Sequence, residues 1–445
     1  MSAPDDVLTE KLRTLIRIPT VSHADPAAND TAAFDAHLDA LARLFPLLHE
    51  RLELTRVGDH GLLLRWAGTS SDRPVVLMAH QDVVPVDPDS PWQHPAFDAV
   101  VADGAVWGRG TLDDKGSLVA ICEAVERLLE RGFAPAQDVW LSFGADEEVS
   151  GRCAPAAVAV LRERGVEPWF VLDEGGAVAA DAFPGVAAPL AVVGVTEKGT
   201  TNLELRTEGR GGHSSMPSRM DTTARLARAI LRLEHSPFPA RVHAPTLEML
   251  RRVAPHAPAP LRPLVANAHR AGPLLARALV AAGPETAAMT RTTATVTTLS
   301  GSPALNVIAS TARAGVNVRV LVGDTVDSVV EHVRRAVRDD SVTVAVLEAG
   351  EPSPVSPTDD DAFRHIESCI EEVFPDAVAT PYIMMGATDA RFFTAICPRV
   401  YRYTPFRMSR AQRAGLHSFD EHLGTADLAD GMQWYQRLIE RLPAS

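Results

Sequence analysis

The sequence contains few cysteines, and their spacing fits none of the usual cysteine motifs. Cys122, Cys153, Cys369 and Cys397 lie far apart in the chain and include no CxxC pair. This spacing argues against a disulfide framework and against a zinc ribbon, and it favours reduced thiols packed in the interior. We therefore assign no chemistry to the cysteines.

Long apolar runs and an excess of basic charge are also missing. No apolar run reaches the ~18 residues of a membrane span, and the amino-terminal stretch lacks a basic segment followed by an apolar core. The chain has 43 basic and 57 acidic residues, which gives a net charge of −14. This balance opposes binding to nucleic acids and to anionic membranes. We expect no nucleic-acid partner, no membrane partner and, by default, a cytoplasmic location.

The first part of the chain alternates helical and strand patterns, which predicts an α/β fold in layers. Its three most apolar short runs lack polar alternation, as strands covered on both faces do. A helical pattern at residues 117–131 lies between the first two runs and can serve as a crossover helix. Helices are also expected at residues 7–16 and 32–48, strands near 52–56 and 61–66, and central strands at 75–79, 139–143 and 169–172.

The order of elements changes after Glu197, which predicts a separate α+β unit inserted into the first. Strands are expected at 201–207, 292–299, 312–322 and 341–347, and helices at 222–233 and 325–338. A Pro-, Ala- and Arg-rich stretch at 237–288 contains helix-like pieces. The Pro-rich residues 351–357 fit a return linker, and helices at 360–373 and 427–442 follow. We divide the chain into 1–196, an inserted unit at 197–350, and 351–445.

Polar side chains follow each of the three central apolar runs. Because ligands bind outside the carboxyl ends of strands in an open α/β sheet, these side chains are expected to converge at one edge. Two more acids precede the crossover helix. Bringing several carboxylates together around one imidazole is costly unless a cation is bound. The converging residues are His80, Asp82, Asp113, Asp114, Asp146, Glu147, Glu148, Asp173 and Glu174.

The types of side chain narrow the choice of metal. Imidazole and carboxylate without thiolate suit Zn²⁺ or a related first-row ion, whereas ligand sets made only of oxygen suit Mg²⁺ or Ca²⁺. Three ligating carboxylates against two divalent ions would leave a charge of about +1, which a bridging hydroxide would neutralise. Two ions therefore fit the charge better than one.

Six motifs occur in an order and spacing that resemble the dinuclear zinc exopeptidase and aminoacylase family. That family includes aminoacylase, carboxypeptidase S, glutamate carboxypeptidase, cytosolic dipeptidases and succinyl-diaminopimelate desuccinylase. The resemblance covers nearly the whole chain and implies a mixed sheet flanked by helices, with an inserted α+β lid domain. Two motifs, WGRGTLDDKG and LDEGG, resemble the carboxypeptidase S and aminoacylase side of the family most. The other four are HQDVVPVD, ADEEVSG, GRGGHSSMP and GLHSFDEH.

The resemblance implies a set of metal ligands. His80 would bind one metal, Asp113 would bridge the two, and Glu148 would bind the second metal. His417 would be the last ligand. The remaining carboxylate comes from LDEGG, where Glu174 is preferred and Asp173 stays an alternative. Two divalent metal ions, both zinc, are therefore expected.

The resemblance also implies catalytic roles. Asp82 would orient the imidazole of His80, and Glu147, unligated beside Glu148, would be the general base for a metal-bridging hydroxide. His213 would stabilise the transition state from the lid, often the lid of a neighbouring subunit. The substrate carboxylate would be recognised by Asn306 and Arg319.

Together these features predict a metal-dependent hydrolase that cleaves an amide bond adjacent to a free carboxylate, in a small peptide or an N-acyl amino acid. A dipeptidase or desuccinylase of the same family is the alternative within enzymes. A non-catalytic metal- or amino-acid-binding protein is the alternative from another class. The long stretch at 237–288 could replace a partner subunit, so both a homodimer and a monomer stay open.

Two groups of polar residues have competing interpretations. Asp114 and Asp146 are expected to cap helices or to support the ligands rather than to bind metal. The string Gly386–Arg391 resembles a family motif on the substrate side, but its residues could equally form a helix cap with a local ion pair. His94 and His422 are expected to be structural or to lie on the surface.

Overall fold

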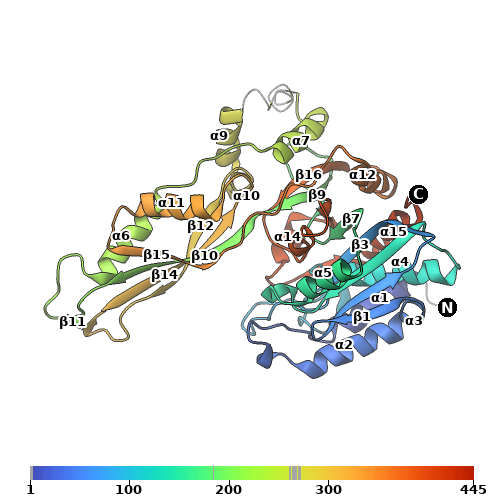
Figure 1. Ribbon diagram of the computed structural model, residues 1–445, viewed down its shortest axis with the longest axis horizontal. Helices are drawn as coiled ribbons and strands as arrows, with labels where there is room; N and C mark the ends of the chain where they lie inside the picture. Colours follow the sequence, from blue (N-terminus) through green and yellow to red (C-terminus); the bar gives the residue numbers. More distant parts are fainter. Residues whose placement is uncertain (1–3, 184, 260–261, 263–267, 269–271, 445) are drawn as a thin grey trace.

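The computed structural model describes residues 4–183, 185–259, 262, 268 and 272–444. In this part of the chain, a large mixed sheet has helices on both faces, and a smaller sheet extends away from it (Figure 1). None of the described helices combines the length and the apolar composition needed to cross a bilayer. The α/β architecture expected from the sequence is therefore present.

The main sheet has ten strands. Its four central strands lie in the order β6, β3, β7 and β17, and each of them runs parallel to the next. Their carboxyl ends consequently meet at one edge, with His80 of β3 paired to Gly144 of β6. In sheet order, the strands are β1 (Glu53–Val57), β2 (Gly61–Trp66), β6 (Gln137–Gly144), β3 (Ser70–His80), β7 (Phe170–Asp173), β17 (Val400–Arg402), β9 (Leu190–Glu197), β8 (Ala177–Ala179) and β18 (Arg407–Met408), while β16 (Val378–Met384) pairs with β9.

Helices cover both faces of this sheet and enclose its two apolar cores. One face carries α1 (Pro4–Ile16), α4 (Lys115–Glu130), α12 (Asp361–Val373) and α15 (Thr425–Glu440). The other carries α5 (Cys153–Glu163) and α13 (Ala390–Phe393). A small side sheet is made of β4 (Val100–Ala102), β5 (Ala105–Trp107) and β19 (His422–Gly424).

The single helix expected at residues 32–48 is wrong, because the structure has two helices there. They are α2 (Thr31–Leu44) and α3 (Pro46–Arg51), separated at Phe45. Pro46 has no backbone N–H and disfavours helical geometry at the preceding residue. Phe45 accordingly has φ −131° and ψ 66°, outside the helical region.

The smaller sheet is antiparallel and has its own core. Its strand order is β12 (Thr293–Ser300), β14 (Thr311–Val320), β10 (Gly199–Glu208) and β15 (Val342–Glu348). Helices α6 (Thr222–Glu234) and α11 (Val326–Val337) pack on one face. At its far tip, β11 (Gly212–His213) pairs with β13 (Val307–Ile308) (Figure 1). We call residues 199–348 without 237–292 the lid.

The helical stretch inside the lid sequence packs on the main sheet. Its helices α7 (Ala244–Val253) and α9 (Gly272–Ala282), with Met289 directly after α10 (Pro284–Ala288), share an apolar core with Leu190 of β9 and Val378 of β16. Of the stretch expected at 237–288, residues 260–261, 263–267 and 269–271 lie outside the described residues. We call residues 237–292 the helical insertion. Its described part packs over β9 and β16 (Figure 1).

Candidate metal centre

The residues expected to bind metal meet at the carboxyl ends of β3, β6 and β7. Asp113 is the common neighbour of two histidines: its Oδ1 lies 2.9 Å from Nε2 of His80, and its Oδ2 lies 3.0 Å from Nε2 of His417. Nε2 of His417 is also 3.1 Å from Oε2 of Glu148. Each oxygen of one carboxylate therefore faces a different imidazole, which is the arrangement a bridging ligand needs.

The choice between the two acids of LDEGG is informed by where each points. Oε1 of Glu174 lies 3.4 Å from Nε2 of His80. The carboxylate of Asp173 instead accepts hydrogen bonds from the backbone N–H groups of Glu174, at 3.0 Å, and Ala390, at 2.9 Å. Asp173 is thus engaged at the start of α13, whereas Glu174 faces the histidine.

Asp82 links two parts of the site. Nδ1 of His80 lies 3.0 Å from the carbonyl oxygen of Asp82 and 3.4 Å from its Oδ1. The same carboxylate accepts the backbone N–H groups of Glu147 and Glu148, both at 3.2 Å, and the hydroxyl of Ser22 at 2.7 Å. One buried carboxylate therefore fixes the ring of His80 and the turn that carries both glutamates.

Glu421 was not predicted from the sequence to have a role. Its wholly buried carboxylate accepts the backbone N–H groups of Leu112 and Asp113, at 2.7 and 3.1 Å, and pairs with Arg109 at 2.6 Å. It thereby holds the loop that carries Asp113. The signal available was its place in GLHSFDEH, the motif that supplies His417.

Asp114 and Asp146, both set aside as capping or supporting residues, behave differently from each other. Asp146 accepts the backbone N–H groups of Arg152 and Cys153 at the start of α5. Asp114 precedes α4 but makes no capping hydrogen bond, so the capping interpretation is wrong for it. Its Oδ2 accepts the backbone N–H of His80 at 3.3 Å, and it forms a ligand-like triad with His80 and Glu174.

The donor set fits a cation. Burial raises the pKa of Glu174, Glu147 and Glu148, because ionised carboxylates are costly to bury close together. Oε1 of Glu148 and Oδ1 of Asp114 are buried without a hydrogen-bond partner among the described residues. Two groups of potential ligands share His80, one with Asp113 and Glu148 and one with Asp114 and Glu174. A bound cation would balance the negative charge of these carboxylate oxygens.

Against the effect of burial, the neighbouring carboxylates raise the pKa of both His80 and His417. Hydrogen bonds to Asp113 and Glu148 raise the pKa of His417 to about 11. Burial opposes ionisation of Asp113, but the neighbouring His417 and His80 still lower its pKa. In the absence of a metal, protons on the imidazoles supply the positive charge that the carboxylates attract.

Glu147 is close to the cluster but uncommitted. No described residue donates a hydrogen bond to its carboxylate, and the side chain lines a cavity next to Asp113, Glu174 and His417. This cavity has a volume of about 520 Å³. A carboxylate free of ligands and facing a cavity is placed to exchange protons with a bound molecule.

The residues expected to act from the lid are not brought to the metal cluster. His213 is exposed at the tip, where Nδ1 lies 2.8 Å from Oγ of Ser215. Asn306 is beside it, since its carbonyl oxygen accepts the N–H of Ser214 at 3.1 Å. Arg319 lies at the other end of the lid sheet, where it donates to Oγ1 of Thr200 at 2.8 Å. Within one chain, the structure therefore separates Asn306 from Arg319.

One of the two arrangements expected for the string Gly386–Arg391 is not found among the described residues. Asp389 is the N-cap residue of α13 but makes no capping hydrogen bond, and Arg391 donates to the carbonyl oxygen of Thr388 at 2.8 Å. A helix cap with a local ion pair is therefore wrong. Gly386 and Ala387, at the start of the string, line the cavity.

His94 and His422 are both partly buried. Both pack against Trp107, with the ring of His422 stacked at a centroid distance of 4.1 Å. This stack anchors the strand that follows the His417 loop.

Comparison with known proteins places these features in a family. The sequence profile of peptidase family M20/M25/M40 matches residues 76–441. A probable carboxypeptidase S-like 2 of Dictyostelium discoideum is 35% identical over 401 residues, covering 89% of this chain and 77% of its own. A Homo sapiens N-fatty-acyl-amino acid synthase/hydrolase is 34% identical over 445 residues, covering 97% of this chain and 87% of its own.

A solved structure shares the fold. The M20 family metallo-carboxypeptidase from Sulfolobus solfataricus superposes with a TM-score of 0.71 at 16% identity, covering 99% of each chain. The chain described here is a member of peptidase family M20/M25/M40, a metal-dependent hydrolase of amide bonds.

Proposed function

We propose that this enzyme hydrolyses an amide bond adjacent to a free carboxylate, in a small peptide or an N-acyl amino acid, with two zinc ions as cofactors. The observation that carries the proposal is Asp113 with one oxygen toward His80 and the other toward His417, each within 3.0 Å. The carboxypeptidase and N-acyl-amino-acid relatives support a substrate with a free carboxylate.

Each ion would have its own ligands on either side of Asp113. His80 and Glu174 would hold one ion, and His417 and Glu148 would hold the other. Asp173 is the less favoured alternative to Glu174, since its oxygens already accept two backbone N–H groups. When bound, such ions polarise the scissile carbonyl and lower the pKa of the attacking water.

Glu147 is the proposed general base. Its carboxylate faces the cavity beside Asp113 and Glu174 and is free to take a proton from water. It then passes that proton to the nitrogen of the leaving amine. Asp82 keeps this turn in place through the N–H groups of Glu147 and Glu148, and it keeps His80 oriented with Nε2 toward the acids.

The lid is proposed to recognise the substrate carboxylate. Arg319 offers this carboxylate a guanidinium fork at the base of the lid and Asn306 offers an amide at its tip, whereas His213 would stabilise the transition state. Strand β10 has 10 residues and spans roughly 33 Å. His213 therefore reaches a metal centre only if the lid rotates or if a second copy of the chain supplies its tip, so a homodimer and a mobile monomer are the two assemblies to distinguish.

The proposal is tested by assaying N-acetyl amino acids and dipeptides with metal-free and zinc-reloaded enzyme. Activity should depend on zinc and should require a free carboxylate, so the corresponding carboxamides should not be cleaved. Glu147→Gln should lose roughly 10²–10⁴-fold in kcat while still binding zinc. Glu163→Gln, an exposed substitution of the same type, is the matched control.

Other outcomes would select another function. Full activity without metal would contradict the proposal. Zinc binding without hydrolysis of any substrate would favour a non-catalytic binding protein, and a restriction to dipeptides would favour a dipeptidase. Light scattering of the purified protein separates the homodimer from the monomer.

A further inference from the structure

The cavity beside the metal centre has a cationic side chain that the proposed mechanism does not use. Among its described lining residues, the basic side chains are Arg413 and His417, and His417 is a proposed metal ligand. Arg413 lies on α14 (Arg410–Gly415), four residues before His417, and is partly buried. A guanidinium on the wall of a substrate cavity is a candidate for binding an anionic group.

Backbone carbonyls, rather than a carboxylate, hold the guanidinium of Arg413. Its Nη1 donates to the carbonyl oxygens of Ala180 and Met408, at 3.0 and 2.7 Å, and its Nε and Nη2 have no acceptor among the described residues. Glu285, an acid on the same cavity wall, pairs with Arg410 at 3.7 Å instead. The edge of the fork formed by Nε and Nη2 is therefore unused, and such an edge can bind a carboxylate through two hydrogen bonds.

Tyr382 of β16 adds a hydroxyl group to the same wall. Its side chain makes no hydrogen bond with another described residue, and burial raises its pKa to about 12, so the hydroxyl remains a donor. Tyr382 and Arg413 each affect the pKa of the other. Burial lowers the pKa of Arg413, and a bound carboxylate would offset that effect. Glu285 acts on both groups, but its side chain is 81% exposed, so solvent screens its charge.

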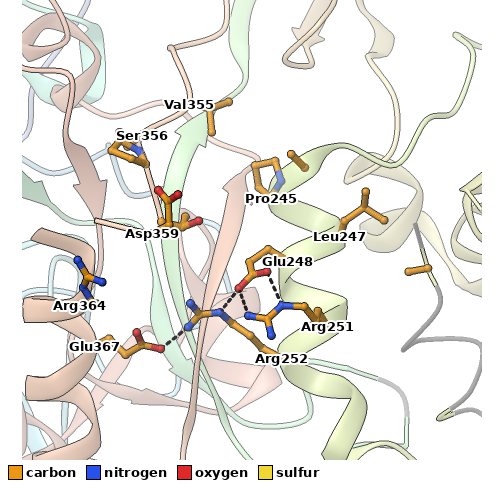
Figure 2. A pocket seen from close by; sticks show the side chains of 14 residues that line it. Pro245, Leu247, Glu248, Arg251, Arg252, Val355, Ser356, Asp359, Arg364 and Glu367 are labelled. Atoms are coloured by element: carbon orange, nitrogen blue, oxygen red, sulfur yellow. Dashed lines mark hydrogen bonds and ion pairs between the residues drawn. The ribbon is translucent and has the colours of Figure 1, made fainter. Parts of the chain in front are cut away.

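A larger hollow, of about 930 Å³, lies between α7 and α12, and most of its arginines are already paired. Figure 2 shows Glu248 of α7 between Arg251 and Arg252, and Arg252 also pairs with Glu367 of α12. Arg364, the third arginine of this lining, is exposed to solvent. An anionic ligand would have to displace carboxylates that are already in place. The cavity beside the metal centre is therefore the better site for an anion.

The position of Arg413 relative to the metal centre selects the part of the substrate that it meets. None of the described residues that line the cavity belongs to the lid, which is proposed to bind the carboxylate next to the scissile amide. The cavity is therefore left for the acyl side of the substrate. Ala177 begins β8 three residues after Glu174, and Ala180, whose carbonyl oxygen holds Arg413, lies three residues further on. Three residues of extended strand span roughly 10 Å.

Resting on the proposed function, we propose that Arg413 and Tyr382 bind the terminal carboxylate of a dicarboxylic acyl group, so that the preferred substrate is an amino acid acylated with such a chain. A suberoyl chain, with seven carbon–carbon bonds of ~1.5 Å, spans the distance from the metal centre, whereas a succinyl chain, with three, does not. Hydrolysis breaks the amide C–N bond, adds the water oxygen to the acyl carbon and a proton to the nitrogen. The products are a dicarboxylic acid and an amino acid.

The test measures kcat/KM of the zinc-loaded enzyme on one amino acid acylated with suberoyl or with octanoyl, which has the same length without the second carboxylate. The suberoyl substrate should be preferred. Arg413→Met should lower the suberoyl-to-octanoyl ratio roughly 10–100-fold, because it removes hydrogen bonds to a charged group, and the loss should appear in KM rather than in kcat. Tyr382→Phe, which keeps the ring, should lower the ratio severalfold. Arg364→Met, the same change at an exposed arginine, should leave the ratio unchanged.

A binding measurement keeps the inference testable if a variant loses activity. Suberate should bind the zinc-loaded wild-type enzyme more tightly than octanoate by calorimetry, and Arg413→Met should remove that difference. If Arg413→Met slows both substrates equally and lowers the Tm, Arg413 only supports the fold and the inference is overturned. Normal hydrolysis of N-acetyl amino acids without a preference for suberoyl would also overturn it and leave the proposed function standing. If no amide is cleaved, the proposed function fails, and equal affinity for suberate and octanoate would then overturn the role of Arg413 as well.

Discussion

Replacing Asp82 by asparagine should loosen the metal centre without changing any residue proposed to bind metal. Both oxygens of this carboxylate are used: Oδ1 accepts from Glu147 N–H, and Oδ2 accepts from Glu148 N–H and Ser22 Oγ. Burial opposes ionisation of Asp82, yet the hydrogen bonds from His80 and Ser22 lower its pKa. The carboxylate is therefore ionised, and its hydrogen bonds are charge-assisted.

The size of the effect follows from the number of donors around Asp82. Asparagine has one acceptor oxygen, and in either orientation its NH₂ group faces a backbone N–H that then lacks an acceptor. An orphaned buried donor costs about 1–3 kcal/mol, and a hydrogen bond to a charged group contributes about 1.5–3 kcal/mol. We expect the free energy of unfolding to fall by about 2–4 kcal/mol and zinc affinity to fall roughly 10–100-fold.

The assay combines urea denaturation of the zinc-loaded protein with competitive zinc titration. Asp89→Asn makes the same chemical change on an exposed loop and serves as the control. If Asp82→Asn and Asp89→Asn have equal unfolding free energies and equal zinc affinities, Asp82 does not organise the site, and the reasoning is refuted.

Three further expectations concern stability. Glu421→Gln removes the charged partner of buried Arg109. The free energy of unfolding measured in urea should therefore fall by about 3–5 kcal/mol. An unchanged free energy of unfolding would show that Arg109 finds another partner. Lys198→Met should be more stable than wild type near pH 7, by about 2–3 kcal/mol, since burial lowers the pKa of Lys198 to about 8. The wild type should regain stability as pH rises from about 8 toward 10.5, because the unfolded chain binds the extra proton in that window; a difference independent of pH would contradict this. Chelating the metals should lower the Tm, and adding zinc should restore it, whereas an unaltered Tm would mean that the cluster holds no ion in the native protein.

The positions of most elements could be predicted because their hydrophobic patterns are regular. Strand β2 (Gly61–Trp66) and helix α12 (Asp361–Val373) lie where periodicity predicts them, within a residue or so. The predicted helix at 32–48 failed where one residue, Pro46, overrides an otherwise continuous pattern. Hydrophobic periodicity shows which face of a helix is buried. It does not show a break in the helix when the residues on both sides of the break continue the same buried face.

The candidate site could be predicted where parallel strands bring their ends together. His80 and Glu148 follow neighbouring strands, so their proximity follows from the sheet. His417 lies on a distant loop and was expected only from the family resemblance. Glu421 was missed because its partners are mostly backbone N–H groups, which carry no sequence signature.

The lid shows a different kind of limit. The sequence connects His213 with catalysis through its motif, but the structure places this residue at the tip of the lid, past the end of β10. A motif identifies the chemistry of a side chain, whereas the orientation of a lid depends on contacts that form between domains or between subunits.

The most direct test of two ions on either side of Asp113 is anomalous X-ray diffraction at the zinc edge, from crystals grown with zinc. We expect two peaks, one beside His80 and Glu174 and one beside His417 and Glu148, both next to Asp113. A single peak, or peaks remote from Asp113, would contradict this expectation.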